Sequence, residues 1–99
     1  MTEEYEKTRG IVIYFNDEHY RVAIEGVRRI IAEHALTQHN WPAIKEAIRN
    51  RQYAPGEPLE LIHTVANLPL DENTDEEAYY WLELMVQNID RTDGIIEEY

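Results

Sequence analysis

The residues with the most distinctive chemistry in this sequence are acids followed directly by aromatic rings. An aromatic ring among fixed carboxylates suits a protein interface, because the ring supplies contact area at low entropic cost and the acids steer a basic partner. The alternative is that the tyrosines pack on neighbouring helices with only their hydroxyls in water. The first interpretation predicts a partner-binding surface made of Asp71, Glu72, Asp75, Glu76, Glu77, Tyr79, Tyr80 and Glu83.

Other chemistry has little support in the residue types. The sequence has no cysteine and no serine, its six threonines lack the context of a catalytic nucleophile, and its four glycines are too dispersed to form a phosphate-binding loop. Of the histidines, only His34 and His39 are close, and their spacing of five is less suitable for a shared ligand than i, i+4. We therefore predict no metal site, no cofactor and no catalytic residue.

Charge is distributed unevenly along the chain. The net charge is -11, and residues 57–99 contain twelve acids but a single base, Arg91. Residues 20–56 carry six bases against three acids, and they supply a predicted basic contact face of Arg28, Arg29, Lys45, Arg49 and Arg51. The acidic part should repel phosphates, so the expected partner is a basic protein, such as one that binds nucleic acid itself. The simplest alternative is that the acids solvate the surface and pair with arginines of the same molecule.

A C-terminal helix must position the acids and tyrosines. Thr74 and Glu77 have the spacing of a capping box, and the acids of the first turn are favoured by the helix dipole. Helical spacing then continues through the apolar positions, and Gly94 is a plausible stop after Arg91. The apolar positions expected to face the core are Ala78, Trp81, Leu82, Met85 and Ile89.

The N-terminal part favours a β-hairpin over residues 10–25. Residues 10–15 are β-branched and aromatic, residues 16–19 are turn formers, and Tyr20, Val22 and Ile24 alternate with more polar residues. The competing interpretation is a single helix over residues 20–36, with Tyr20, Ile24, Val27, Ile31 and Ala35 on one stripe. Gly26 would cost such a helix about 1 kcal/mol, so the hairpin is preferred, followed by a helix over residues 27–36 that turns Val27, Ile30, Ile31 and His34 inward.

Two further helices are expected in the middle of the chain. Asn40 is a suitable N-cap for a helix over residues 41–52, with Pro42 in its first turn and Trp41, Ile44, Ala47 and Ile48 inward. The prolines and glycine of residues 53–58 end it and form the clearest internal boundary. Residues 59–68 fit a short helix before Pro69, although a strand is possible on periodicity alone.

These elements predict an α+β fold, an N-terminal β-hairpin followed by three to four helices around one core, with a small all-α bundle as the alternative. A length of 99 residues and 43% hydrophobic residues suit a single domain over residues 1–99. The longest uninterrupted apolar run is far too short for a membrane span, and neither a signal peptide nor disulfides are indicated, so a cytoplasmic location and no membrane partner are expected.

Three functional hypotheses follow. The leading one is a small non-catalytic protein-binding module, in its sharpest form an inhibitor whose acidic C-terminal helix and loop dock on a basic surface and imitate the charge of nucleic acid. The alternative is a homo-oligomer in which the basic middle of one chain meets the acidic C-terminal part of another. The third is a small enzyme that uses His34, His39 or His63 with a carboxylate.

Overall fold

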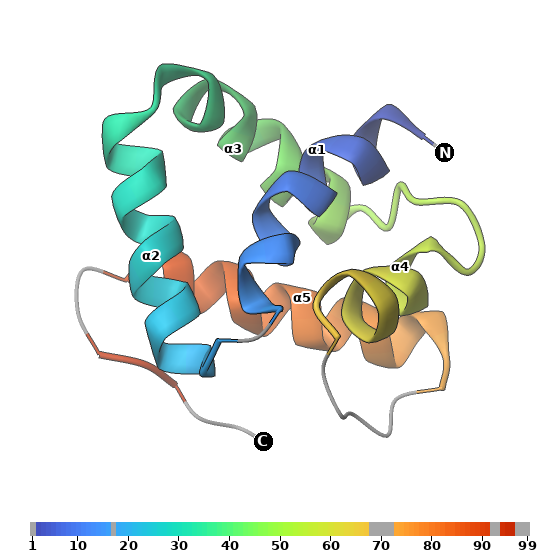
Figure 1. Ribbon diagram of the computed structural model, residues 1–99. Helices are drawn as coiled ribbons and strands as arrows, with labels where there is room; N and C mark the ends of the chain where they lie inside the picture. Colours follow the sequence, from blue (N-terminus) through green and yellow to red (C-terminus); the bar gives the residue numbers. More distant parts are fainter. Residues whose placement is uncertain (1, 17, 68–72, 92–93, 97–99) are drawn as a thin grey trace.

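Helices account for every regular element that the structure describes. The computed structural model describes residues 2–16, 18–67, 73–91 and 94–96 (Figure 1). Its elements are α1 (Glu3–Val12), a 3-10 turn η1 (Ile13–Phe15), α2 (Tyr20–Glu33), α3 (Ala35–Arg49), α4 (Glu57–Glu60), a π-helical turn η2 (Leu61–Val65) and α5 (Asp75–Asp90). α2 packs against α3 and α5, while α1 lies against α3 and η2. The predicted α+β class is wrong, and the all-α alternative is correct.

The predicted hairpin over residues 10–25 fails because helical periodicity outweighs local β-propensity. Thr2 caps α1 by accepting a hydrogen bond from the Tyr5 N–H, and the helix runs through Gly10. Its buried positions recur every three or four residues and continue into η1; they are Tyr5, Thr8, Ile11, Val12 and Phe15. The second predicted strand is the start of α2, where Val22 is 50% exposed although Ile24 is fully buried. Alternation therefore does not describe burial in this segment.

α2 follows the competing helical interpretation more closely than the preferred one. Ile24 and Val27 are buried, Tyr20 and Ile31 pack against the core, and the helix passes through Gly26. A Cβ at Gly26 would meet nothing within 4 Å, so the glycine is tolerated at its intrinsic cost. The predicted inward position of His34 is wrong: His34 is exposed, and its extended backbone separates α2 from α3.

α3 begins earlier and ends earlier than residues 41–52. Asn40 lies inside the helix and is not its N-cap, and Pro42 is an interior residue. The predicted apolar face is confirmed, since Trp41, Ile44, Ala47 and Ile48 are all buried. The chain leaves the helical conformation after Asn50, where Arg51 has a φ of 51°.

The second half of the chain contains both predicted helices, although the first one runs from Glu57 to Val65 and not over residues 59–68. The boundary at residues 53–58 contains the loop that leads into α4, with Gly56 at a φ of 88°. α4 and η2 form the short helical segment expected before Pro69, although Pro69 itself lies outside the described residues. α5 buries all five predicted core positions, and residues from both sides of the boundary contribute to one hydrophobic core. Within the part of the chain that the structure describes, no helix has the length and apolar character needed to cross a membrane.

Candidate functional site

The candidate site is built on α5, whose first turn is fixed by the predicted capping box. The Thr74 hydroxyl accepts a hydrogen bond from the Glu77 N–H at 3.2 Å. In return, Glu77 Oε1 accepts from the Asn73 N–H at 3.1 Å and from the Thr74 hydroxyl at 3.0 Å. The hydrogen bonds that the Glu77 carboxylate accepts from the Asn73 N–H and the Thr74 hydroxyl lower its pKa. Glu77 therefore stays ionised at the positive end of the helix dipole.

Several predicted acids of this site form hydrogen bonds or ion pairs with other residues of the same molecule. Asp75 Oδ2 accepts a hydrogen bond from the Gly56 N–H at 2.9 Å, which ties α5 to the loop before α4. Arg51 reaches Glu76 with Nε and Nη2 at 3.3 and 2.6 Å, and Glu83 with Nη1 at 2.6 Å. Hydrogen bonding to Arg51 lowers the pKa of Glu76, and the same contacts raise the pKa of Arg51. Asp71 and Glu72 lie outside the described residues.

The two adjacent tyrosines have opposite environments. Tyr79 is buried, the Arg51 guanidinium lies 5.1 Å from its ring centre, and its hydroxyl accepts a hydrogen bond from the Tyr53 N–H at 3.2 Å. Burial raises the pKa of Tyr79. Tyr80 points away from the core and is 55% exposed. Of these two tyrosines, only Tyr80 is therefore accessible to a partner, whereas Tyr79 packs in the core beneath α5.

Tyr80 borders a hollow and is surrounded by carboxylates. Glu76 and Glu77 lie one turn before it on α5, and Glu83 lies one turn after it. The adjacent hollow of about 270 Å³ is lined by Tyr80, Glu83, Leu84, Gln87 and Ile96. We call Glu76, Glu77, Tyr80, Glu83 and Gln87 the Tyr80 surface. It combines an accessible ring with carboxylates whose positions are set by the capping box and Arg51.

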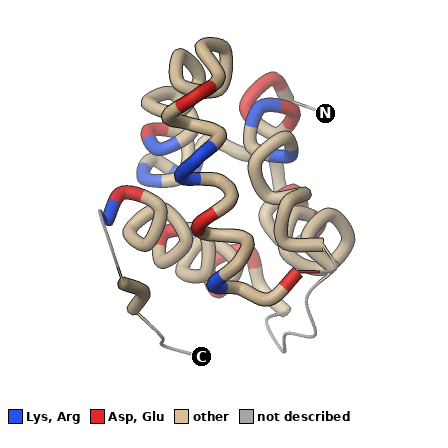
Figure 2. The backbone as a smooth tube through the Cα atoms, turned by 60° about the vertical axis from the view of Figure 1, so that its left-hand side comes forward, with Lys and Arg blue, Asp and Glu red and all other residues tan. Residues whose placement is uncertain are grey.

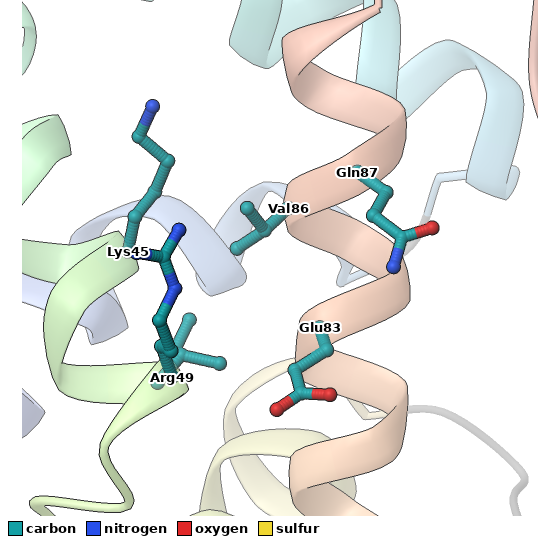
Figure 3. A pocket seen from close by; sticks show the side chains of 6 residues that line it. Lys45, Arg49, Glu83, Val86 and Gln87 are labelled. Carbon is teal, nitrogen blue, oxygen red and sulfur yellow. The ribbon is translucent and has the colours of Figure 1, made fainter.

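A second hollow lies on the other side of Glu83, between α5 and α3. It has a volume of about 260 Å³, and Lys45 and Arg49 rise from α3 opposite Glu83, Val86 and Gln87 of α5 (Figure 3). Lys45 Nζ is 3.1 Å from Asp90, which also accepts a hydrogen bond from the Trp41 indole N–H at 2.9 Å. Basic and acidic groups thus face each other across this hollow within one chain.

The five predicted basic residues lie on α2, on α3 and in the turn after α3. Lys45 and Arg51 pair with α5, Arg49 is 3.9 Å from Glu46 on its own helix, and Arg29 is exposed on α2. Arg28 donates to the backbone carbonyls of Asn88, at 3.2 Å, and of Gly94, at 2.7 Å. Acidic and basic positions are interspersed along the folded helices, although they separate along the sequence (Figure 2). The contacts that the oligomer hypothesis places between two chains occur here within one.

Asn88 is a structural residue of the site that the sequence interpretation missed. It is fully buried; its Nδ2 donates to the Tyr20 hydroxyl at 2.9 Å and to the Ile96 carbonyl at 3.1 Å. Its Oδ1 accepts from the Ile96 N–H at 2.6 Å. These bonds hold Ile96 at the wall of the hollow beside Tyr80. A polar residue three positions after Met85, on an otherwise apolar helix face, is the sequence signal for such a role.

Replacing Asn88 with alanine is expected to lower the free energy of unfolding by about 2 kcal/mol, because three hydrogen bonds are lost around buried groups. The Ile96 amide should also exchange with deuterium faster than in the wild type. Thermal unfolding and hydrogen exchange measure the two effects. Gln87→Ala is the control, since the Gln87 side chain is exposed on the preceding position. Unchanged protection of the Ile96 amide in Asn88→Ala would contradict this role.

The histidines do not converge on a common site. His34 and His39 are exposed at the α2–α3 junction and in α3, while His63 is partly buried in η2. Among the described residues there is no group of three or more His, Cys, Asp or Glu side chains that could hold a metal ion. Comparison with known proteins adds no assignment: no protein-family model, no curated protein and no solved structure matches the chain.

Proposed function

We propose that this chain is a non-catalytic protein-binding module that docks its Tyr80 surface on a basic surface of another protein. The observation that carries the proposal is the 55% exposed Tyr80 ring among carboxylates held by internal hydrogen bonds. Such a site loses little side-chain entropy on binding, because its acids are already positioned. In its sharpest form, the module is an antagonist that covers a surface its partner uses for nucleic acid. A cytoplasmic location remains part of this proposal.

Arg51 gives the proposal a direct chemical test. It neutralises part of the charge of Glu76 and Glu83, so it competes with any cation that a partner brings to the same carboxylates. Glu83 contacts Arg51 through Oε1, while Glu77 serves the capping box through its own Oε1. Because the Tyr80 surface has three carboxylates and Arg51 supplies a single positive charge, this surface keeps a net negative charge. Removing Arg51 frees the charge of Glu76 and Glu83 for a basic partner, and this gain in charge should outweigh the loss of their fixed positions. Removing Tyr80 should weaken binding.

The experiment compares capture of host-lysate proteins by the tagged wild type, Tyr80→Ala, Glu83→Gln and Arg51→Gln, followed by affinity measurements with the purified captured protein. We expect one basic protein, released by salt, whose affinity falls about 30-fold in Tyr80→Ala and rises in Arg51→Gln. Circular dichroism and thermal unfolding control for folding. Equal capture by all four proteins, or weaker binding by Arg51→Gln, would contradict docking through this surface. The oligomer and enzyme hypotheses stay predictions.

A further inference from the structure

A second surface, on the α1 side of the molecule, has a different character. Two hollows of about 330 and 200 Å³ lie between α1 and α3 and share Lys7 and Ile44 as lining residues. Because they share these residues, the two hollows lie side by side, and we call them together the α1–α3 trough. Buried Ile11 and Ile44 contribute to its lining. This surface does not include any residue of the Tyr80 surface.

Two apolar side chains that line the trough are exposed to solvent. Leu36, in the first turn of α3, is 73% exposed and lines the larger hollow. Ala43, two helical turns after Leu36 on the same side of α3, is also exposed and lines the smaller hollow. Exposed apolar side chains along a concave surface are typical of grooves that receive a helix.

Gly10 lines the same trough from α1, and none of the residues that the structure describes requires a glycine there. A Cβ at Gly10 would meet nothing within 4 Å, and the residue lies inside a regular helix. A glycine in a helix interior costs about 1 kcal/mol relative to alanine. The absence of a side chain at this position lets another backbone approach α1 closely, which is the use that the lining of the trough suggests.

The charges around the trough indicate what would occupy it. Glu4, Glu6 and Glu46 line it. Its lysine, Lys7, is 3.3 Å from Glu3, and Arg49 is 3.9 Å from Glu46, so the lining acids outnumber the cation among them. A second copy of this chain would bring the same acids and a net charge of -11 to the contact. An amphipathic helix with an apolar stripe flanked by Lys or Arg would meet opposite charges at both edges. Charge complementarity therefore favours a basic helix of another protein over self-association.

We propose that the α1–α3 trough binds an amphipathic helix whose apolar face packs on Leu36 and Ala43, above the buried Ile11 and Ile44, and whose basic flanks pair with Glu4, Glu6 and Glu46. The probe is a synthetic peptide of about 15 residues with leucines at helical spacing and flanking lysines. A peptide with glutamates in place of the lysines, and a scrambled peptide, serve as ligand controls. The protein is titrated with each peptide, and the changes in its amide chemical shifts show where the peptide binds and with what affinity.

Gly10→Leu is the decisive variant, because it fills the trough without removing any contact of the fold. We expect it to keep or raise the melting temperature, as leucine favours a helix over glycine, while it weakens binding of the lysine-flanked peptide about tenfold or more. Gly26→Leu is the matched control: its Cβ also meets nothing within 4 Å, but Gly26 lies on α2 and outside the trough. It should leave peptide affinity unchanged.

Tyr80→Ala separates this proposal from docking through α5 and should also leave affinity for the peptide unchanged. Equal binding of the lysine-flanked and scrambled peptides, equal binding by the wild type and Gly10→Leu, or shifts confined to α5 would overturn the proposal. Sedimentation that shows a concentration-dependent dimer lost in Gly10→Leu would overturn it in favour of a second copy.

Discussion

Replacing Trp81 with alanine is expected to lower the free energy of unfolding by about 3–5 kcal/mol, the usual cost of removing a large buried aromatic side chain. Trp81 is 1% exposed, and its ring packs edge-on against Phe15 at 5.4 Å and Tyr20 at 6.0 Å. These two partners lie in η1 and at the start of α2. The substitution should therefore loosen the attachment of α5 to the N-terminal part of the fold as well as create a cavity.

Chemical denaturation monitored by far-UV circular dichroism measures the loss of free energy of unfolding. Thermal unfolding should show a fall in melting temperature of about 4–8 °C for each kcal/mol. Tyr80→Ala is the matched control, because it removes an aromatic ring from the adjacent position of the same helix. With Tyr80 mostly exposed, its loss should change stability by no more than about 0.5 kcal/mol. A similar loss of stability in both variants would mean that α5 does not face the core as described.

The contrast between Trp81 and Tyr80 separates the residues of α5 that pack in the core from those that face solvent, where we propose that a partner binds. Trp81 packs in the core, so its replacement should affect binding only by unfolding the protein. Tyr80 contributes little to the fold and should affect binding alone. A variant series that separates the two effects therefore tests the orientation of α5 independently of what the protein binds.

Local signals in the sequence predict the second half of the chain well. The capping box of Thr74 and Glu77 and the apolar stripe from Ala78 to Ile89 lie within one helix, so short-range rules are sufficient. The N-terminal part fails because residues 10–15, taken alone, have strand propensity. Only the longer pattern from Tyr5 through Phe15, with Thr2 as the cap, reveals the helix. Tertiary burial then decides against the local preference.

The candidate site was predictable in its residue types but not in its pairing. Nothing local indicates that Arg51 meets Glu76 and Glu83, because these residues are 25 and 32 positions apart. The contact depends on the turn after α3, where Arg51 itself adopts a positive φ that a non-glycine residue rarely takes. The general alternative that arginines pair with acids of the same molecule is confirmed at this position, while the partner-binding role of the remaining surface stays a prediction.

Glu57 is expected to be the most important acid for folding, although its role is unrelated to the predicted surface. It is 5% exposed at the start of α4, and its Oε1 accepts from the Ala54 N–H at 2.8 Å and the Thr2 hydroxyl at 2.9 Å. Its Oε2 accepts from the Thr2 N–H at 3.1 Å. Because Thr2 also caps α1, this one carboxylate joins the start of α1 to the start of α4.

Hydrogen bonding determines the charge state of Glu57. Burial alone raises the pKa of this carboxyl, but the hydrogen bonds from Thr2 and Ala54 outweigh burial and place its pKa below the ordinary value. A lowered pKa in the folded state means that Glu57 stabilises the fold fully above the unfolded-state pKa of about 4.3. This contribution is lost as the pH falls through the lower pKa of the folded state.

Glu57→Gln is expected to lower the free energy of unfolding by about 3 kcal/mol at pH 7, because an amide cannot accept all three hydrogen bonds and carries no charge. The difference from the wild type should shrink as the pH falls below about 4, where the wild-type carboxyl becomes protonated and resembles the amide. Denaturation curves at several pH values measure this difference, and comparison at each pH cancels the titration of the other acids. Glu60→Gln is the control, since an amide oxygen can still accept the Tyr5 hydroxyl that Glu60 binds at 3.1 Å. A difference between the wild type and Glu57→Gln that stays constant from pH 7 to about 3 would show that the charge of Glu57 does not stabilise the fold.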